Sequence, residues 1–249
     1  MPAGSQTVAA PAAPVVVTEP KSPAAAPQPT PGAWDEGTFV RSEDKRELGR
    51  ETFVIKQTPD QWQLVVDTQG QINELHYELI SNRDLTIQRV RMTNRPDVDP
   101  PMTASSDIAL DAEGILVERG VDLDGTATQT RAENKVDWYV TSSLTASLFP
   151  VCHLDPSRPA TRAMYPRTSV KIEAARPFDI GVPARTLTLR TLRFPSGRNT
   201  KIACEGNKLA GEASMSYVVV RAGDDKLATA LAGVLDPATP VDDPPPPTE

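Results

Sequence analysis

Histidine, cysteine and aromatic residues are scarce in this sequence. Its 249 residues include two His and two Cys, and aromatic residues make up 5% of the chain. His76 and His153 are far apart in sequence, so the i, i+4 histidine pair of a zinc-binding helix is not available. We therefore expect no metal centre built on histidine and no cofactor.

Established catalytic motifs are also absent. The sequence has no nucleophile elbow, phosphate-binding loop, dinucleotide fingerprint or zinc-protease helix. Cys152 and His153, followed by Asp155, look like a nucleophile, a base and an orienting carboxylate. Neighbouring side chains of an extended chain point to opposite faces, however, which misplaces the base. We predict a protein that is not an enzyme, although a hydrolase with an unrecognised carboxylate pair stays an alternative because such pairs leave no readable spacing.

Two acidic pairs have the Asp-x-Asp spacing that can bring two carboxylates near one calcium ion. These are Asp97 with Asp99 and Asp122 with Asp124. Neither pair is followed by the further Asp or Asn and the final Glu of an EF-hand loop. Since aspartate is common in turns, we predict turns here and no metal site.

Positive charge is not in excess, and no apolar run is long. The 26 Lys and Arg are outnumbered by 33 Asp and Glu, so the net charge is -7. Nucleic-acid binding needs clustered basic residues, and we predict no nucleic-acid partner. No segment approaches the roughly 20 apolar residues that cross a bilayer, and the first residues lack the segments of a signal peptide. We expect no transmembrane segment, and an exported protein whose signal peptide is missing from this sequence stays open.

Proline is concentrated at the two ends of the chain. Residues 1–32 contain eight Pro and eight Ala and no aromatic residue, and residues 236–249 contain six Pro and four acidic residues. Such compositions cannot bury enough apolar surface to offset the entropy of ordering. We predict a disordered Pro/Ala-rich tether over 1–32, a single β-rich domain over 33–235 and a disordered acidic tail over 236–249.

Alternation of apolar and polar residues dominates the predicted domain and indicates short strands. The predicted strands are 38–41, 51–57, 62–66, 73–80, 84–93, 106–110, 115–119, 126–131, 138–148, 169–174, 186–194, 201–205 and 213–221. The strands 73–80 and 84–93 form a predicted hairpin with a turn at 81–83, in which Tyr77 and Leu79 oppose Leu85 and Ile87. A Pro-rich crossing is expected over 150–166, and helical spacing predicts one helix over 224–235.

Many short strands without strand–helix alternation predict a mainly β fold. We expect a curved antiparallel meander that forms a half-open barrel or sandwich, with one short C-terminal helix. Polar residues on the second face of many strands predict that one side of the sheet faces water.

Large apolar residues are spread along successive predicted strands. If the sheet curls, they line its concave side, which would suit an apolar or lipid-like ligand. The predicted ligand-binding residues are Phe53, Trp62, Tyr77, Trp138, Phe149, Phe194 and Tyr217. The alternative is that these residues only fill the core of a closed barrel or a sandwich.

The two cysteines leave two possibilities open. Cys152 and Cys204 can form one disulfide in an oxidising compartment, which would close a loop of about 50 residues. Two free thiols in a cytosolic protein are equally ordinary.

The segment GTFVRSEDKRELGRETFVIKQTPDQWQLVVDTQG, residues 37–70, resembles the opening hairpins of uncharacterised bacterial envelope proteins of the lipoprotein-carrier-like type. The likeness concerns the order and lengths of strands over about half of the chain. It implies a curved, incompletely closed antiparallel sheet whose concave face accepts acyl chains. It further implies a periplasmic or surface-tethered protein, and no catalytic residues.

These observations lead to one functional expectation and its alternatives. We expect a non-enzymatic cell-envelope protein that binds an apolar or amphiphilic ligand, or an envelope partner. One alternative is a structural or protein-interaction module that uses an exposed sheet edge. The other is the hydrolase with a carboxylate pair.

Overall fold

A computed structural model of the chain describes residues 30, 32–70, 73–96, 102–132, 136–139, 144–165, 168–181 and 184–235. The predicted tail and nearly all of the predicted tether lie outside these residues, as does the Asp97–Asp99 pair.

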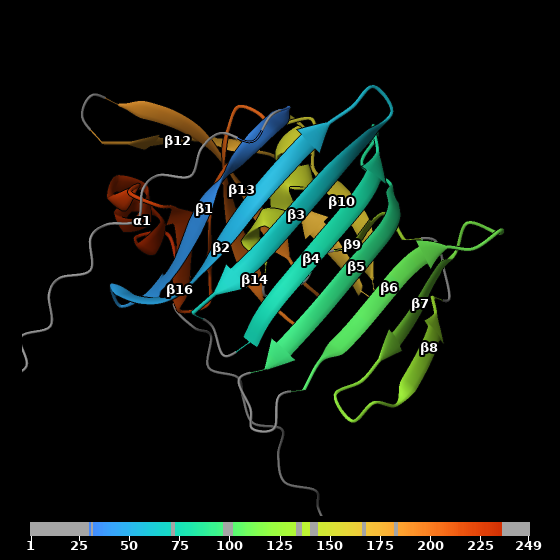
Figure 1. The fold of residues 1–249 in the computed structure, drawn as a ribbon. Coiled ribbons are helices and arrows are strands. Elements are labelled where there is room, and N and C mark those ends of the chain that lie inside the picture. Colours follow the sequence, from blue (N-terminus) through green and yellow to red (C-terminus); the bar gives the residue numbers. More distant parts are fainter. Residues whose placement is uncertain are drawn as a thin grey trace, which may run out of the picture.

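The described chain is mainly β, as predicted, and its strands join in one 16-stranded sheet (Figure 1). The strands are β1 (Ala33–Glu43), β2 (Arg46–Gln57), β3 (Gln61–Gln69), β4 (Asn73–Asn82), β5 (Ile87–Pro96), β6 (Ala104–Leu110), β7 (Leu116–Val121), β8 (Ala127–Arg131), β9 (Trp138–Tyr139), β10 (Ala160–Tyr165), β11 (Thr168–Ile172), β12 (Arg176–Ile180), β13 (Arg185–Arg193), β14 (Asn199–Glu205), β15 (Lys208–Ser214) and β16 (Tyr217–Arg221). The 3₁₀ helix η1 (Thr145–His153) and the α-helix α1 (Asp225–Ala232) complete the described elements.

The sheet is an antiparallel meander that does not close. Its order is β8-β7-β6-β5-β4-β3-β2-β1-β16-β15-β14-β13-β11-β10-β9, with β12 paired to β13. The first and last strands pair near the centre of the sheet, and only β9 and β10 pair in parallel among the described strands. The sheet curls so that a front wall, β1–β5, faces a back wall, β13–β16 (Figure 1).

Strict alternation explains why the front wall buries one face. In β2, Glu51, Phe53 and Ile55 are buried, and in β3 Trp62 and Leu64 continue the same inner surface. The residues between them point outward. The prediction of a water-facing side therefore holds for this wall.

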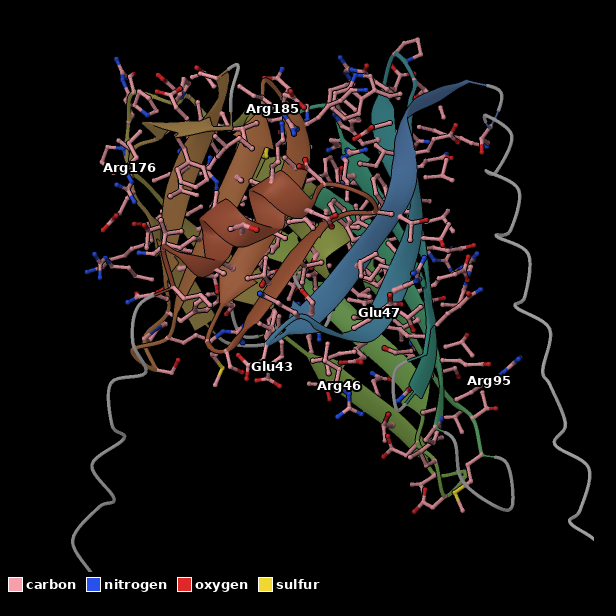
Figure 2. All side chains as sticks on the ribbon, turned by 90° about the vertical axis from the view of Figure 1, so that its left-hand side faces the viewer. Glu43, Arg46, Glu47, Arg95, Arg176 and Arg185 are labelled. Carbon is pink, nitrogen blue, oxygen red and sulfur yellow. A yellow bond between two sulfur atoms is a disulfide. The ribbon has the colours of Figure 1, made fainter. Side chains whose placement is uncertain are left out.

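The back wall is buried on both faces, so the expectation of one water-facing side is wrong there. Its inner face joins the main core, whereas Leu187, Val218 and Val220 form a second cluster with Leu227 and Leu231 of α1. Figure 2 shows this helix lying across the outside of the back wall. The helix was predicted, and Asp224 caps it by accepting a hydrogen bond from the Leu227 N–H at 3.2 Å.

The largest difference from the predicted strands lies between β8 and β10. A strand was predicted over 138–148, but β9 covers only Trp138–Tyr139, and residues 145–148 begin η1. Pro150 lies inside η1 and has no N–H to donate to a sheet ladder. The prediction was wrong because a short buried apolar run has no period that separates strand from helix.

Further strand boundaries and one register also differ from prediction, and β10 lies where the Pro-rich crossing was expected. The single strand predicted over 213–221 is broken by a turn in which Met215 has a φ of 52°. β4 extends to Asn82, so the turn predicted at 81–83 instead closes between Asn82 and Thr86, and a register shift occurs between Ile80 and Ser81. Tyr77 consequently pairs with Met92, so the predicted pairing with Leu85 and Ile87 is wrong.

Candidate functional site

The concave side of the sheet is occupied by η1, which we call the plug (Thr145–His153). It runs between the two walls (Figure 1) and contacts β2, β14 and β15. Residues 145–152 are all buried. The interior of the curved sheet is therefore filled by a segment of the chain itself.

The structure brings most of the predicted ligand-binding residues together around the plug. Phe53, Tyr77 and Phe149 are fully buried in one apolar cluster, and Trp62 is 3% exposed in the same cluster. Phe194 and Tyr217 are partly buried and pack against it, whereas the side chain of Trp138 lies outside the described residues.

Aromatic rings gather where the plug ends at His153, and we call this region the aromatic end (Trp34, Trp62, Phe149 and His153). The Trp62 ring centroid lies 5.0 Å from that of Trp34, 4.9 Å from that of His153 and 5.9 Å from that of Phe149. The strands β1 and β3 start here, which places Trp34 and Trp62 at the same edge of the front wall.

Two cationic side chains cover the aromatic end. The Arg83 guanidinium lies 5.1 Å from the centroid of the Trp62 ring, and the Lys208 ammonium lies 5.5 Å from that of Trp34. Lys208 also pairs with Asp35 at 3.4 Å. Arg83, in contrast, makes no ion pair with a carboxylate in the described part of the chain, and donates to the carbonyl oxygen of Thr58 at 3.3 Å.

Three polar atoms at the aromatic end are buried without a hydrogen-bond partner among the described residues. They are Trp62 Nε1, Ser81 Oγ and His153 Nε2. Ser81 is 2% exposed and lies directly opposite Trp62 across the β3–β4 ladder. Burial, together with the nearby Arg83 charge, lowers the pKa of His153. Unpartnered buried polar atoms are rare, and a group of them indicates a missing partner.

The other end of the plug is held by two buried acids, and we call it the carboxylate end (Glu51, Glu212 and Thr145). The Glu51 oxygens accept from the N–H groups of Thr145 at 2.9 Å and Ala146 at 3.1 Å. The Glu212 oxygens accept from the hydroxyls of Thr145 at 2.8 Å and Tyr217 at 3.2 Å. Both carboxyl groups thus bind the first residue of the plug.

Two arginines balance the charge of this acid pair. The Arg41 Nη2 atom lies 3.8 Å from Glu51 Oε1, and its guanidinium is stacked 4.6 Å from the Tyr217 ring centroid. Arg198 donates to the Tyr217 hydroxyl at 3.2 Å. The carboxylate end is therefore a connected polar network inside the protein.

Burial changes the protonation of both acids. It raises the pKa of Glu51 to about 7, with a further raising contribution from Glu212, although the hydrogen bonds from Thr145 and Ala146 oppose the shift. Burial likewise raises the pKa of Glu212. Because the two groups interact, they titrate as a pair and bind protons more readily than exposed acids.

A disulfide ties the plug to the back wall. The sulfur atoms of Cys152 in η1 and Cys204 in β14 lie 2.05 Å apart, with 52 positions between the two residues. Of the two possibilities left open by the sequence, the structure has the bonded one. Cys152 is therefore not the free thiol that a nucleophile needs. A disulfide is compatible with a protein outside the cytoplasm.

The outer surface of the front wall carries a further cluster, in which His76 Nδ1 lies 2.7 Å from Asp67 Oδ1. The hydrogen bond to Asp67 raises the pKa of His76, so this histidine is more readily protonated. We interpret the cluster as a solvated ion pair. The Asp122–Asp124 turn is self-contained, because Asp124 accepts from the Thr126 N–H at 2.8 Å.

Searches of the described residues found neither a helix long and apolar enough to span a membrane nor a group of residues suited to hold a metal ion.

Comparisons with protein-family models, with curated proteins and with solved structures found no match to this chain. The resemblance to lipoprotein-carrier-like proteins therefore stays a prediction.

Sequence reasoning missed the polar residues at both ends of the plug. A signal existed for two of them, because Glu51 is in phase with Phe53 and Ile55, and Ser81 is in phase with Tyr77. A polar residue on the apolar face of a strand is a candidate for a buried role. Glu212 offered no such signal, since the residues around it are small.

Proposed function

We propose that this protein is a non-enzymatic cell-envelope protein that binds an amphiphilic, lipid-like ligand on the concave face of its sheet. The observation that carries the proposal is the plug. An unclosed, curved sheet presents a continuous apolar inner face, and a 3₁₀ segment, instead of further strands, covers it. Ligand replaces the plug against that face.

The plug suits this exchange because it is attached at its two ends by different kinds of contact. The disulfide of Cys152 is covalent, whereas Thr145 has no covalent crosslink and is held by hydrogen bonds and by the packing of Leu144 and Ala146 in the apolar cluster. In the proposed exchange, the Thr145 end swings away while the Cys152 end stays in place. Without ligand, the return of the plug keeps the apolar face out of water.

An extracytoplasmic location, periplasmic or tethered to the cell surface, is part of the proposal. The disulfide supports it, since such bonds persist mainly in oxidising compartments. The Pro/Ala-rich composition of residues 1–32 would serve as a spacer to an anchor. Determining the redox state of both cysteines in protein from its native cell tests this part.

The binding proposal is tested with the delipidated full chain and the methyl ester of dansyl-labelled undecanoic acid, an uncharged apolar probe. We expect a saturable rise in dansyl fluorescence that unlabelled lipid reverses. Glu51→Ala, which loosens the Thr145 end, is expected to speed probe association. Glu47→Ala is the matched control, because Glu47 lies on the same strand but is exposed. No saturable binding to any variant would remove the proposal.

A protein-interaction module stays the second candidate. The strand β8 forms one edge of the sheet, and most of its residues are exposed. Met102, Val121 and Leu123, around β6–β8, are among the exposed large apolar residues. An open strand edge beside apolar side chains favours pairing with a partner strand. A charged substitution in β8 that abolishes capture of an envelope partner would favour this candidate.

The contacts of the two buried acids favour a role in holding the plug over a role in hydrolysis. Glu51 and Glu212 accept hydrogen bonds from the plug itself, and both are buried beneath it. A carboxylate pair that cleaves a substrate has to face that substrate. Turnover in a broad hydrolase screen that Glu51→Gln abolishes would reverse this preference.

A further inference from the structure

The aromatic end contains more hydrogen-bonding capacity than the described protein uses. We propose that Trp62, Ser81, His153 and Arg83 form a subsite for an anionic group, a carboxylate or a phosphate. The inference deepens the proposed function and rests on it in one respect, namely that the anion is the head group of the amphiphile.

The unpartnered atoms match what an anion needs. The Trp62 indole N–H can only donate, and the Ser81 hydroxyl can donate as well. Both side chains are more than nine-tenths buried, at 3% and 2% exposure. A negative oxygen accepts from such donors more strongly than a neutral one does, and this gain is largest away from water.

Charge at the site has the sign that an anion requires. The Arg83 guanidinium lies over the Trp62 ring, and its charge acts on His153. Two carboxylates on neighbouring segments have partners of their own: Asp35 binds Arg221 and Lys208, and Asp84 accepts from the Thr86 N–H at 2.9 Å. Arg83 forms no ion pair with a described carboxylate, and its guanidinium lies against the Thr58 carbonyl oxygen and the Gln57 side-chain amide, which are neutral groups.

Access and orientation also fit a head group. Arg83 is exposed and His153 is half-buried, so the subsite faces solvent on their side. Its inner side is the start of the apolar cluster, where the Phe149 ring lies 5.9 Å from that of Trp62. The nearby Cys152 disulfide keeps this end in place while the Thr145 end of the plug moves. A head group held here would direct its chain along the space that the plug leaves.

An ordered water molecule is the competing explanation for the unpartnered atoms. Water can satisfy two to four buried polar groups. A water molecule is neutral, however, and gives the charge of Arg83 no part in ligand binding. Anion binding and water occupancy therefore differ in what a substitution of Arg83 does to binding.

The experiment compares two probes on the oxidised full chain: dansyl-labelled undecanoic acid and its methyl ester, which differ in the charge of the head group. We expect the acid to bind about tenfold more tightly than the ester, as for one charge-assisted hydrogen bond. Arg83→Gln and Ser81→Ala should each remove most of this preference and leave the ester unchanged. Arg46→Gln, an exposed arginine in the β1–β2 hairpin at the other end of the sheet (Figure 2), is the matched control.

Acetate and inorganic phosphate distinguish a head group from a free anion. Their titration is followed through the indole N–H resonance of Trp62, assigned with Trp62→Phe. If acetate or phosphate shifts the Trp62 resonance and Arg83→Gln abolishes the shift, the subsite binds free anions. If only the acid probe shifts the resonance, the subsite is specific for the head group of an amphiphile.

Failure of the subsite is distinct from failure of the proposed function. Equal affinity for acid and ester in every variant, with no resonance shift, overturns the subsite although ester binding still supports the proposed function. An anion-induced shift that depends on Arg83, without any ester binding, supports an anion site while the amphiphile proposal fails.

Discussion

The two ends of the plug are both polar and both buried, yet they differ in how their hydrogen bonds are satisfied. At the carboxylate end, all four oxygens of Glu51 and Glu212 accept hydrogen bonds from described residues. At the aromatic end, Trp62, Ser81 and His153 each bury a polar atom without such a partner.

This difference separates a structural contact from a candidate binding site. Two buried carboxyl groups whose oxygens all accept hydrogen bonds are held in one arrangement. Buried donors without partners lose hydration and gain nothing in exchange, so they destabilise the unliganded protein. The carboxylate end therefore holds the plug, whereas the aromatic end retains hydrogen-bonding capacity that the described residues do not use.

The largest effect is expected from removing the covalent attachment. Replacing Cys152 and Cys204 by Ala should lower the free energy of unfolding by about 4 kcal/mol, because the crosslink restricts a long loop in the unfolded chain. Urea unfolding of the oxidised protein and the double variant measures the difference. A change below about 1 kcal/mol would mean that the plug is held mainly by packing.

The next effect concerns the carboxylate end. Glu51→Ala leaves the N–H groups of Thr145 and Ala146 without their acceptor, and should destabilise the protein by about 3 kcal/mol. Chemical denaturation provides the measurement, with the exposed Glu47→Ala as control. Equal stability of the two variants would contradict the role of Glu51 in holding the plug.

The raised pKa of Glu51 predicts a specific pH dependence. The folded state binds this proton more tightly than the unfolded chain, whose Glu titrates near 4.5. The stabilisation is therefore complete below about pH 4.5 and is lost as the pH rises through about 7. We expect the free energy of unfolding to fall by on the order of 2 kcal/mol between about pH 5 and pH 7.

Glu51→Gln is the matched variant for this pH profile. It should flatten the profile and leave the contribution of Glu212, whose pKa is shifted in the same direction. Denaturant unfolding at a series of pH values makes the comparison. A profile that keeps its slope in Glu51→Gln would assign the dependence to other groups.

The smallest effect contrasts two buried serines. Ser81→Ala removes an unpartnered hydroxyl and should leave the unliganded protein equally stable, or stabilise it by less than about 1 kcal/mol. Ser147→Ala removes a hydroxyl that donates to the Leu144 carbonyl oxygen at 2.7 Å, and should destabilise by about 1 kcal/mol. Thermal unfolding of both variants tests the contrast, which would fail if Ser81→Ala proved the more harmful.

Local patterns were sufficient for the fold class and for the C-terminal helix. Alternation over 51–66 predicted strands with one buried face, and the spacing of Leu227 and Leu231 predicted α1. Each of these two signals comes from residues that lie within a few positions of each other in the sequence. The register of the β4–β5 hairpin was mispredicted because β4 extends to Asn82 and the turn closes between Asn82 and Thr86, and because a register shift occurs between Ile80 and Ser81.

The candidate site was predicted in part. Its apolar residues were identified, since large side chains in alternating positions of a strand usually face the core, but residues 145–148 of the plug were predicted as strand and residues 150–153 as part of the Pro-rich crossing. Residues 145–152 are all buried and therefore carry no amphipathic period. Nothing in their spacing indicates that Thr145 meets Glu51 and Glu212, which are 94 and 67 positions away.

The sequence by itself determined a mainly β chain, an apolar inner face on its front wall and a C-terminal helix, because each depends on periods of two to four residues. Tertiary structure alone decided that the plug fills the concave side, that two distant acids hold one of its ends, and that Trp62, Ser81 and His153 bury polar atoms at the other. These features depend on contacts between segments that only the curling of the sheet brings together. The physical reason is that hydrogen bonds and charges act over a few ångströms in space, whatever their separation along the chain.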